Sequence, residues 1–83
     1  MPEASRAAPR ADVAFDAKDQ GCGELVLTLK RMLDGMAPGS VLELRALDPG
    51  AVQDIPAWCR LTRHELVHAR PDMHRWWIRR RSD

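Results

Sequence analysis

The sequence is poor in cysteine: it has only Cys22 and Cys59, and no Cys-x-x-Cys pair. Two cysteines in a chain of 83 residues cannot build the disulfide framework of a small secreted domain. The interval between them also matches no zinc-ligand pattern. We therefore expect free thiols and no structural metal.

Long apolar runs and an excess of one charge are also absent. No stretch is long and apolar enough to span a bilayer, and no apolar segment follows the N-terminal arginines. We therefore expect neither a membrane span nor a secretory signal. The formal net charge is +1, so the overall charge predicts no particular partner. These absences favour a cytoplasmic protein.

The first residues differ in composition from the rest of the chain. Residues 1–12 are rich in Ala, Pro and Arg and show no apolar periodicity, so we expect a disordered N-terminal tail. Residues 13–83 are enough for one small domain with a modest core.

The first half of that domain alternates between two periodicities. Val13–Ala17 and Val41–Leu47 repeat every second residue and predict strands. Between them, residues 24–36 repeat at helical spacing and predict an amphipathic helix that the Ala37-Pro38-Gly39 turn ends. The apolar side of this helix is made of Leu25, Leu29, Met32, Leu33 and Met36.

The second half predicts another helix and a hairpin. Asp48 as cap and Pro49 in first position predict the helix start, and Asp54-Ile55-Pro56 offers a second start. Either the helix begins twice, or Pro56 lies within its early turns. Its expected buried side consists of Val52, Ile55, Trp58, Cys59 and Thr62. A strand over residues 64–70 should place Leu66 on one face and Val67 and Ala69 on the other. The turn at residues 71–73 should join it to a last strand at residues 76–78, which ends in three arginines.

The element order β-α-β-α-β-β restricts the fold. The two β-α units favour parallel pairing of the first two strands through a right-handed crossover. Each helix has a single apolar stripe, so both helices can cover one face of the sheet. We predict an α/β two-layer sandwich, with two helices on one face of a four-stranded mixed sheet.

Cys22 lies where the first strand gives way to the first helix. The unpaired N–H groups and the macrodipole at a helix N-terminus stabilise a thiolate over a thiol. The position therefore suits a reactive cysteine.

Several segments of the chain match one family. Phe15-Asp16-Ala17 resembles the opening strand of this family, and Met36 to Gly39 resembles its helix-ending turn. Asp48-Pro49 followed by Asp54-Ile55-Pro56 matches its Asp-Pro…Asp-Ile-Pro segment in residue type and spacing. His64-Glu65-Leu66 and Ile78-Arg79-Arg80 resemble the start and end of the last two strands. On these residues the chain, from about Phe15 to Arg80, resembles the TusA/SirA family of small sulfur-carrier proteins. That resemblance implies the same βαβαββ fold.

The chain departs from this family beside the cysteine. The family's Cys-Pro-x-Pro motif reads Cys22-Gly23-Glu24-Leu25 here, so both prolines are replaced. Gly23 and Leu25 each restore a backbone N–H, while Gly23 adds conformational freedom. The electrostatic stabilisation of a thiolate is retained, and the rigidity of the turn is reduced.

The resemblance implies a function and a set of site residues. Cys22 would relay persulfide sulfur from a donor protein of the cysteine desulfurase or rhodanese type to an acceptor protein, without metal or organic cofactor. Gly23, Glu24, Arg79 and Arg80 would support the site or face the partner.

Two other functions are compatible with the sequence. The first is a non-catalytic regulatory or interaction module on the same fold. The second is RNA binding by Arg75, the Trp76-Trp77 pair and residues 79–81, although we do not expect a nucleic-acid partner, because the net charge is near zero. Cys59 is expected in the core, the alternative being a resolving cysteine for Cys22.

Overall fold

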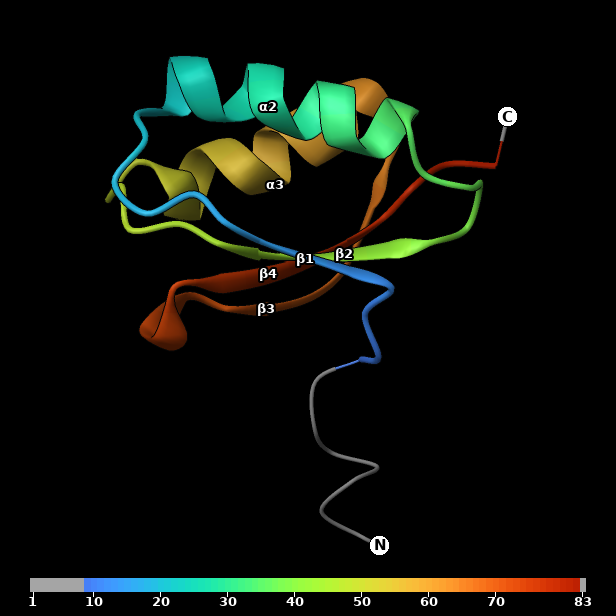
Figure 1. Ribbon diagram of the computed structural model, residues 1–83. Helices are drawn as coiled ribbons and strands as arrows, with labels where there is room; N and C mark the ends of the chain where they lie inside the picture. The colour runs from blue at the N-terminus through green and yellow to red at the C-terminus, as the bar shows by residue number, and fades with distance from the viewer. Residues whose placement is uncertain (1–8, 83) are drawn as a thin grey trace, which may run out of the picture.

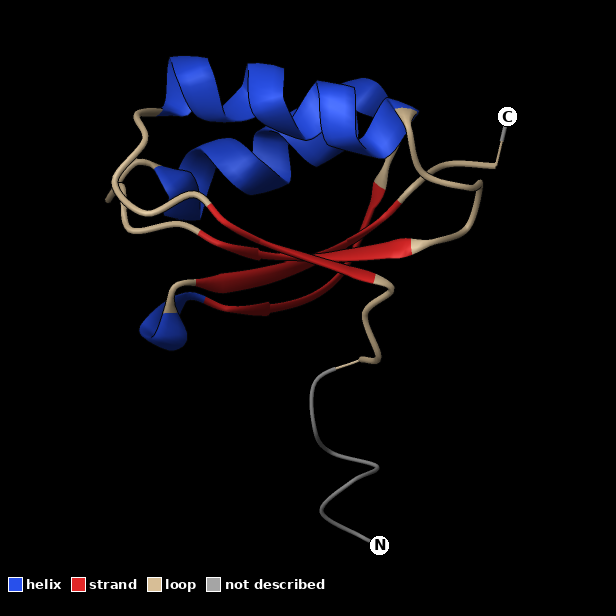
Figure 2. Ribbon diagram, in the orientation of Figure 1, coloured by secondary structure: helices blue, strands red, loops and turns tan. Residues whose placement is uncertain are grey.

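The computed structural model describes residues 9–82, except for the side chain of Cys22. The elements follow one another as β1 (Val13–Asp16), α2 (Cys22–Asp34), β2 (Val41–Arg45), α3 (Ala51–Thr62), β3 (Glu65–Arg70), a short 3-10 turn (Pro71–Met73) and β4 (Arg75–Arg79). Both helices lie on one face of the sheet, as Figures 1 and 2 show. The predicted two-layer α/β sandwich is confirmed.

The four strands form one mixed sheet in the order β1-β2-β4-β3. Strand β1 runs parallel to β2, and β4 is antiparallel to both β2 and β3. The parallel pair and the β3–β4 hairpin are therefore as predicted. Because β1 and β2 are parallel, α2 and α3 both start at the same end of the sheet, on the left in Figure 1.

The core lies between the helical layer and the sheet. Period-two strands and 3.6-period helices each turn one apolar side to this layer. Leu25, Leu29 and Leu33 of α2 are fully buried there, as are Leu42 and Leu44 of β2. The predicted apolar side of the first helix is thus its buried side. The core also contains Ile55, Cys59, Trp76 and Ile78.

The bounds of the two helices differ from the predictions. Helix α2 begins at Cys22 rather than Glu24 and ends at Asp34 rather than Met36. Helix α3 begins at Ala51, with Gly50 rather than Asp48 as its N-cap. Pro56 lies inside the helix, which is the second of the two alternatives that the sequence left open. Its buried residues are Ala51, Ile55 and Cys59, while Val52 is 48% exposed. The predicted burial of Val52 was wrong, because a helix starting at residue 51 turns residues 51, 55 and 59 to the core.

A bulge in β3 corrects the predicted faces of that strand. The pairing with β4 shifts between Leu66 and His68, which leaves Val67 as the extra residue. Beyond the bulge the alternation is inverted, so Ala69 packs on the core together with Leu66. The prediction that Leu66 and Ala69 lie on opposite faces was wrong for this reason.

The second face of the sheet carries charged residues around one buried ring. Trp77 is 3% exposed and packs against His68 in a tilted arrangement, with 5.0 Å between ring centroids. Each arginine on this face is paired with an acid, in the pairs Asp16–Arg45, Glu43–Arg75, Glu65–Arg79 and Arg70–Asp72. This face is consequently almost neutral.

Residues 1–8 of the predicted tail lie outside the described part of the chain. Asp12, its last residue, is bound to the sheet by two hydrogen bonds. Its N–H donates to the carbonyl of Val41, and its carboxylate accepts from the N–H of Val41, both at 2.9 Å. Neither helix within residues 9–82 has the length and apolar character to cross a membrane.

Candidate functional site

A hydrogen-bonded loop fixes the approach from β1 to α2. The N–H of Ala17 donates to the carbonyl of Arg45, and the N–H of Leu47 donates to the carbonyl of Lys18. Asp16 accepts from the N–H of Lys18, which has a positive φ of 53°. This bond, with the Arg45 ion pair, holds the pKa of Asp16 below its usual value. The loop thus places the start of α2 over the carboxyl ends of β1 and β2.

Helix α2 begins with three consecutive small or flexible positions. Gly21 is the N-cap, Cys22 the first helical residue and Gly23 the second. The first intrahelical bond runs from the N–H of Leu25 to the carbonyl of Gly21, at 2.9 Å. No side chain of the described part caps this end. The first-turn N–H groups therefore leave a site where a negative charge is stabilised.

The structure explains one of the two replaced prolines of the family motif. Leu25 is fully buried, and its N–H makes the first bond of α2. A proline here would remove that donor and a core side chain. Gly23 is different, because a Cβ added to it would meet nothing within 4 Å, and its φ lies outside the left-handed region. Leucine at position 25 is thus required by the core, whereas glycine at position 23 is not required sterically.

Glu24 is the acidic residue of the first turn of α2 and is exposed. Its carboxylate accepts a hydrogen bond of 3.4 Å from the amide nitrogen of Gln20. The other end of that amide, Oε1 of Gln20, is buried without a hydrogen-bond partner in the described part of the chain. Gln20 was not among the predicted site residues, and its position two residues before Cys22 is the only sequence signal that could have indicated it.

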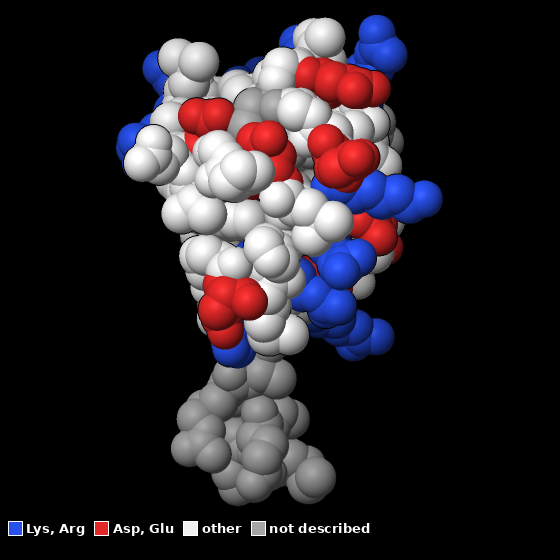
Figure 3. Space-filling model, turned by 90° about the vertical axis from the view of Figure 1, so that its left-hand side faces the viewer, with Lys and Arg blue, Asp and Glu red and all other residues white. Residues whose placement is uncertain are grey.

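The end of the molecule where both helices start is acidic. Acidic side chains are spread over this end, whereas Lys and Arg lie around its margin, most densely toward the lower right (Figure 3). Asp19 and Glu24 belong to the start of α2, and Asp48 and Asp54 to that of α3. Acids in the first turn of a helix complement its dipole. A basic protein surface would complement this end of the molecule.

Arg79 and Arg80 are not brought to this end. Arg79 forms an ion pair of 2.9 Å with Glu65 on the open face of the sheet. The Nε of Arg80 donates to the carbonyl of Leu33 at 2.6 Å, in the last turn of α2. That turn lies ~16 Å along the helix from Cys22. Of the predicted site residues, the structure therefore brings together Cys22, Gly23 and Glu24 only.

The arginines after β4 act as caps for the helices. Arg80 binds the carbonyl of Leu33 at the end of α2, and Arg81 donates at 2.8 Å to the carbonyl of Thr62 at the end of α3. Sequence reasoning considered this arginine run as a binding surface and missed the capping. The neighbouring rings of Trp76 and Trp77 are buried, with exposed fractions of 1% and 3%. Neither ring is available for stacking on a base.

Cys59 lies in the core, in the third turn of α3, and is 2% exposed. Burial raises the pKa of its thiol to about 11, an effect that the neighbouring Arg60 charge only partly offsets. A thiol with so little thiolate at neutral pH does not attack a persulfide or a disulfide. The geometry thus favours the packing role predicted for Cys59 over the resolving role.

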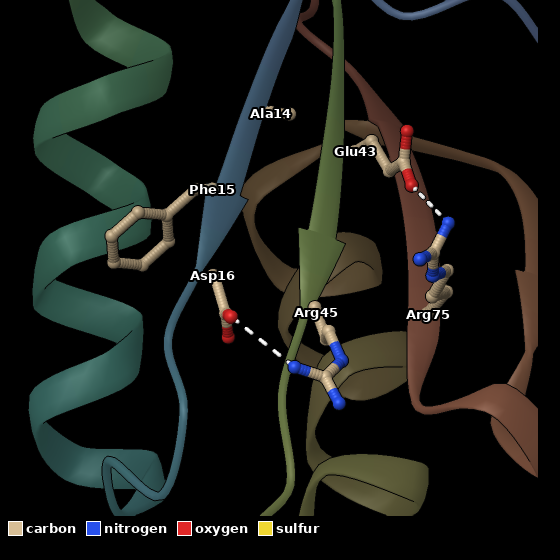
Figure 4. A pocket seen from close by; sticks show the side chains of 6 residues that line it. All are labelled: Ala14, Phe15, Asp16, Glu43, Arg45 and Arg75. Carbon is tan, nitrogen blue, oxygen red and sulfur yellow. Dashed lines mark hydrogen bonds and ion pairs between the residues drawn. The ribbon is translucent and has the colours of Figure 1, made fainter.

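A hollow of about 440 Å³ lies on the open face of the sheet, beside β1. Figure 4 shows that Asp16 meets Arg45 and Glu43 meets Arg75 across it, while Phe15 turns toward the helical layer. The charges of these two pairs cancel. This hollow therefore carries no excess charge to attract an ionic ligand.

Comparison with known proteins supports the family resemblance. A family model described as "Sulfurtransferase TusA" matches residues 14–80. The "Sulfur carrier protein TusA" of Pseudomonas paraeruginosa is 35% identical over 74 residues, which cover 87% of this chain and 94% of the relative. The proteins of the same name from Pseudomonas putida and Pseudomonas syringae pv. tomato are 34% and 35% identical over 87% of this chain, and over 92% and 88% of the relatives.

Proposed function

Because the chain belongs to the TusA family of sulfurtransferases, we propose that it carries sulfur as a persulfide on Cys22. Membership of this family supports a sulfur-carrier role and implies protein partners in sulfur transfer. Our proposal goes further in three points: the residue that carries the sulfur, the chemistry of the two transfer steps, and the cytoplasm as the place of transfer. Cytoplasmic thiols are kept reduced, and the relay needs a reduced Cys22.

In the first step, the Cys22 thiolate attacks the terminal sulfur of a cysteine persulfide on the donor. The new S–S bond forms on Cys22 as the donor's S–S bond breaks and the donor cysteine leaves as a thiolate. In the second step, an acceptor thiolate attacks the terminal sulfur of the Cys22 persulfide, and the Cys22 thiolate is regenerated. Each step exchanges one S–S bond for another and needs no external oxidant or reductant.

The observation that carries the proposal is the position of Cys22 as the first residue of α2. Both steps make or consume an anion on sulfur at this residue. The first-turn N–H groups, which no side chain of the described part caps, favour that anion. Proline is not needed for this effect, since the N–H groups and the helix dipole supply it.

Gly23 and Glu24 are exposed in the same turn, and we assign them to the surface that meets the partner. Gly23 keeps the approach to Cys22 free of a side chain, and Glu24 adds a negative charge beside it. We infer a cysteine desulfurase or a rhodanese as donor, because both enzymes carry a cysteine persulfide. The partner-facing role predicted for Arg79 and Arg80 concerns a different surface and stays a prediction.

The test is sulfur loading followed by mass spectrometry. Reduced protein is incubated with a cysteine desulfurase and cysteine, and separately with a rhodanese and thiosulfate. The peptide containing Cys22 should gain about 32 Da, one sulfur atom, and lose it on reduction. Cys59→Ala should load normally, and Cys22→Ser should not load. The absence of the adduct on Cys22 with both donors would refute the proposal.

The missing motif prolines favour a second candidate function. Gly23 leaves the first turn of α2 less rigid than a proline would, so Cys22 is held less firmly for sulfur transfer, whereas binding of a partner does not require a positioned thiolate. This interaction module predicts that Cys22→Ser binds the donor as tightly as the natural protein. A donor that binds equally well to both forms but loads neither would favour it.

A further inference from the structure

A second hollow lies between α2 and α3 at the end where both helices stop. Its volume is about 370 Å³. The ring of Trp58 and the side chain of Leu61 form its apolar part, and Leu61 is 82% exposed. The remaining lining residues are Lys30, Asp34, Thr62, His64 and Arg81. The described residues thus leave a large apolar side chain of α3 uncovered beside an aromatic ring.

The Trp58 ring is held in place by His64. It packs against the ring of His64, with centroids 5.6 Å apart and planes inclined by 33°. His64 is 8% exposed, and its Nδ1 accepts from the N–H of Arg81 at 3.0 Å. A partly exposed aromatic ring with a fixed orientation binds a partner at a low entropic cost. Such rings are typical anchors of protein interfaces.

Lys30, Asp34 and Arg81 are the charged residues that line this hollow, and further basic residues adjoin the lining segments in the sequence. Residues 30–35, 58–64 and 80–82 together contain one acid, Asp34, and six cations: Lys30, Arg31, Arg60, Arg63, Arg80 and Arg81. Asp34 is already bound to Lys30 at 2.9 Å. That hydrogen bond, with the charges of Lys30 and Arg80, lowers the pKa of Asp34. The net charge around the hollow therefore attracts an anionic partner.

We propose that this hollow binds an acidic peptide segment of a partner protein, with one large apolar side chain seated on Trp58 and Leu61. The apolar part requires an apolar group, and the cationic border requires acidic neighbours on either side. Nucleic acid fits less well, because the Trp58 ring already packs against His64, and Arg80 and Arg81 already donate to helix carbonyls. A peptide needs neither several rings nor a row of phosphate-binding donors.

The site is independent of sulfur transfer. It lies at the last turn of α2, whereas Cys22 is the first residue of that helix. A partner could therefore occupy the hollow while the first turn of α2 stays uncovered. The chain would then have two docking surfaces, an acidic one at the start of the helices and a basic one at their end.

The test is a titration of the isotope-labelled protein with a synthetic peptide that has a central leucine flanked by glutamates. We expect saturable shifts of the NMR signals of the Trp58 indole and of residues 61–63. Leu61→Asp should weaken this binding about tenfold, through lost apolar contact and charge repulsion. The matched control is Leu47→Ala, an exposed leucine at the other end of the molecule, which should bind normally.

Three results would overturn the proposal. The first is the absence of shifts around Trp58 at millimolar peptide. The second is equal binding of a peptide in which lysines replace the glutamates, which would exclude the charge complementarity. The third is that a single-stranded RNA shifts the same signals more strongly than the peptide, which would assign the hollow to nucleic acid.

Discussion

The two ends of the helical layer are built from opposite charges. At the end where α2 and α3 start, acids lie in the first turns and in the loops before them, and no described side chain caps the first turn of α2. At the end where they stop, Arg80 and Arg81 cap the last carbonyls. Both arrangements complement the helix dipoles. The end where the helices stop uses its polar groups to cap backbone carbonyls. The other end leaves first-turn N–H groups of α2 uncapped beside Cys22, the residue that we propose carries sulfur.

The largest effect that can test this contrast is Leu25→Pro, which restores the second proline of the family motif. The change removes the first hydrogen bond of α2 and a fully buried side chain. We expect the free energy of unfolding to fall by about 3 kcal/mol or more. Urea denaturation measures it. A loss below about 1 kcal/mol would mean that the open end tolerates the motif, contrary to the role assigned to Leu25.

Cys59 allows a second test, because its thiol is buried in the core, between the two ends of the helical layer. Its folded pKa of about 11 is above its ordinary value of 9.0, so the folded state holds its proton more tightly than the unfolded state. The resulting stability is fully present below pH 9 and is lost as pH rises toward 11. We expect a decrease of about 2–3 kcal/mol over that range.

Unfolding curves at increasing pH measure this contribution, and Cys59→Ala is the control that should remove it. If the variant and the natural protein lose stability in parallel between pH 9 and 11, the desolvation of Cys59 is not the cause. The same property makes Cys59 inert toward alkylating reagents at neutral pH. Any fast thiol reaction of the folded protein then reports on Cys22.

Arg80→Ala tests the capped end. The change removes a charged donor from the carbonyl of Leu33, and we expect the free energy of unfolding to fall by about 1–2 kcal/mol. Arg31→Ala is the matched control, since Arg31 is exposed in the last turn of α2 and forms no ion pair with another described residue. It should change stability by less than about 0.5 kcal/mol. Equal effects of the two substitutions would show that charge alone, not the cap, stabilises this end.

The sequence predicted the fold because its periodicities are strong and consistent. The alternation in β2 and the helical repeat of Leu25, Leu29 and Leu33 each give one apolar side. Two helices with such a side bury it by packing on the apolar face of a sheet. The errors occurred where tertiary contacts decide. The bulge at Val67 depends on pairing with β4, which no local pattern in β3 indicates.

The candidate site was predictable in part. Cys22 stands out in the sequence by its position before an apolar helix. The exact first residue of that helix could not be predicted, because Gly21 and Gly23 offer no capping side chain that would mark it. The roles of Arg80 and Arg81 depend on carbonyls of Leu33 and Thr62, which are remote in sequence. Such contacts between distant residues become visible only when the helices and β4 are packed together.

The smallest expected effect comes from Gly23→Pro, which restores the first motif proline at the open end. Gly23 is the second residue of α2, its added Cβ would meet nothing within 4 Å, and no partner for its N–H is recorded in the described part of the chain. Proline is accepted in the first helical turn and restricts the unfolded chain. We therefore expect stability to rise by about 0.4–1 kcal/mol.

Sulfur loading of Gly23→Pro then separates two roles of this residue. If the open end needs only the helix dipole and the remaining N–H groups, the variant should load Cys22 as fast as the natural protein. If the N–H of Gly23 itself stabilises the sulfur anion, loading should slow although stability rises. Gly23→Ala is the control, because it removes the glycine and keeps the N–H. If both stability and loading fall in Gly23→Pro, the backbone of the first turn of α2 is more constrained than the free space around Gly23 indicates.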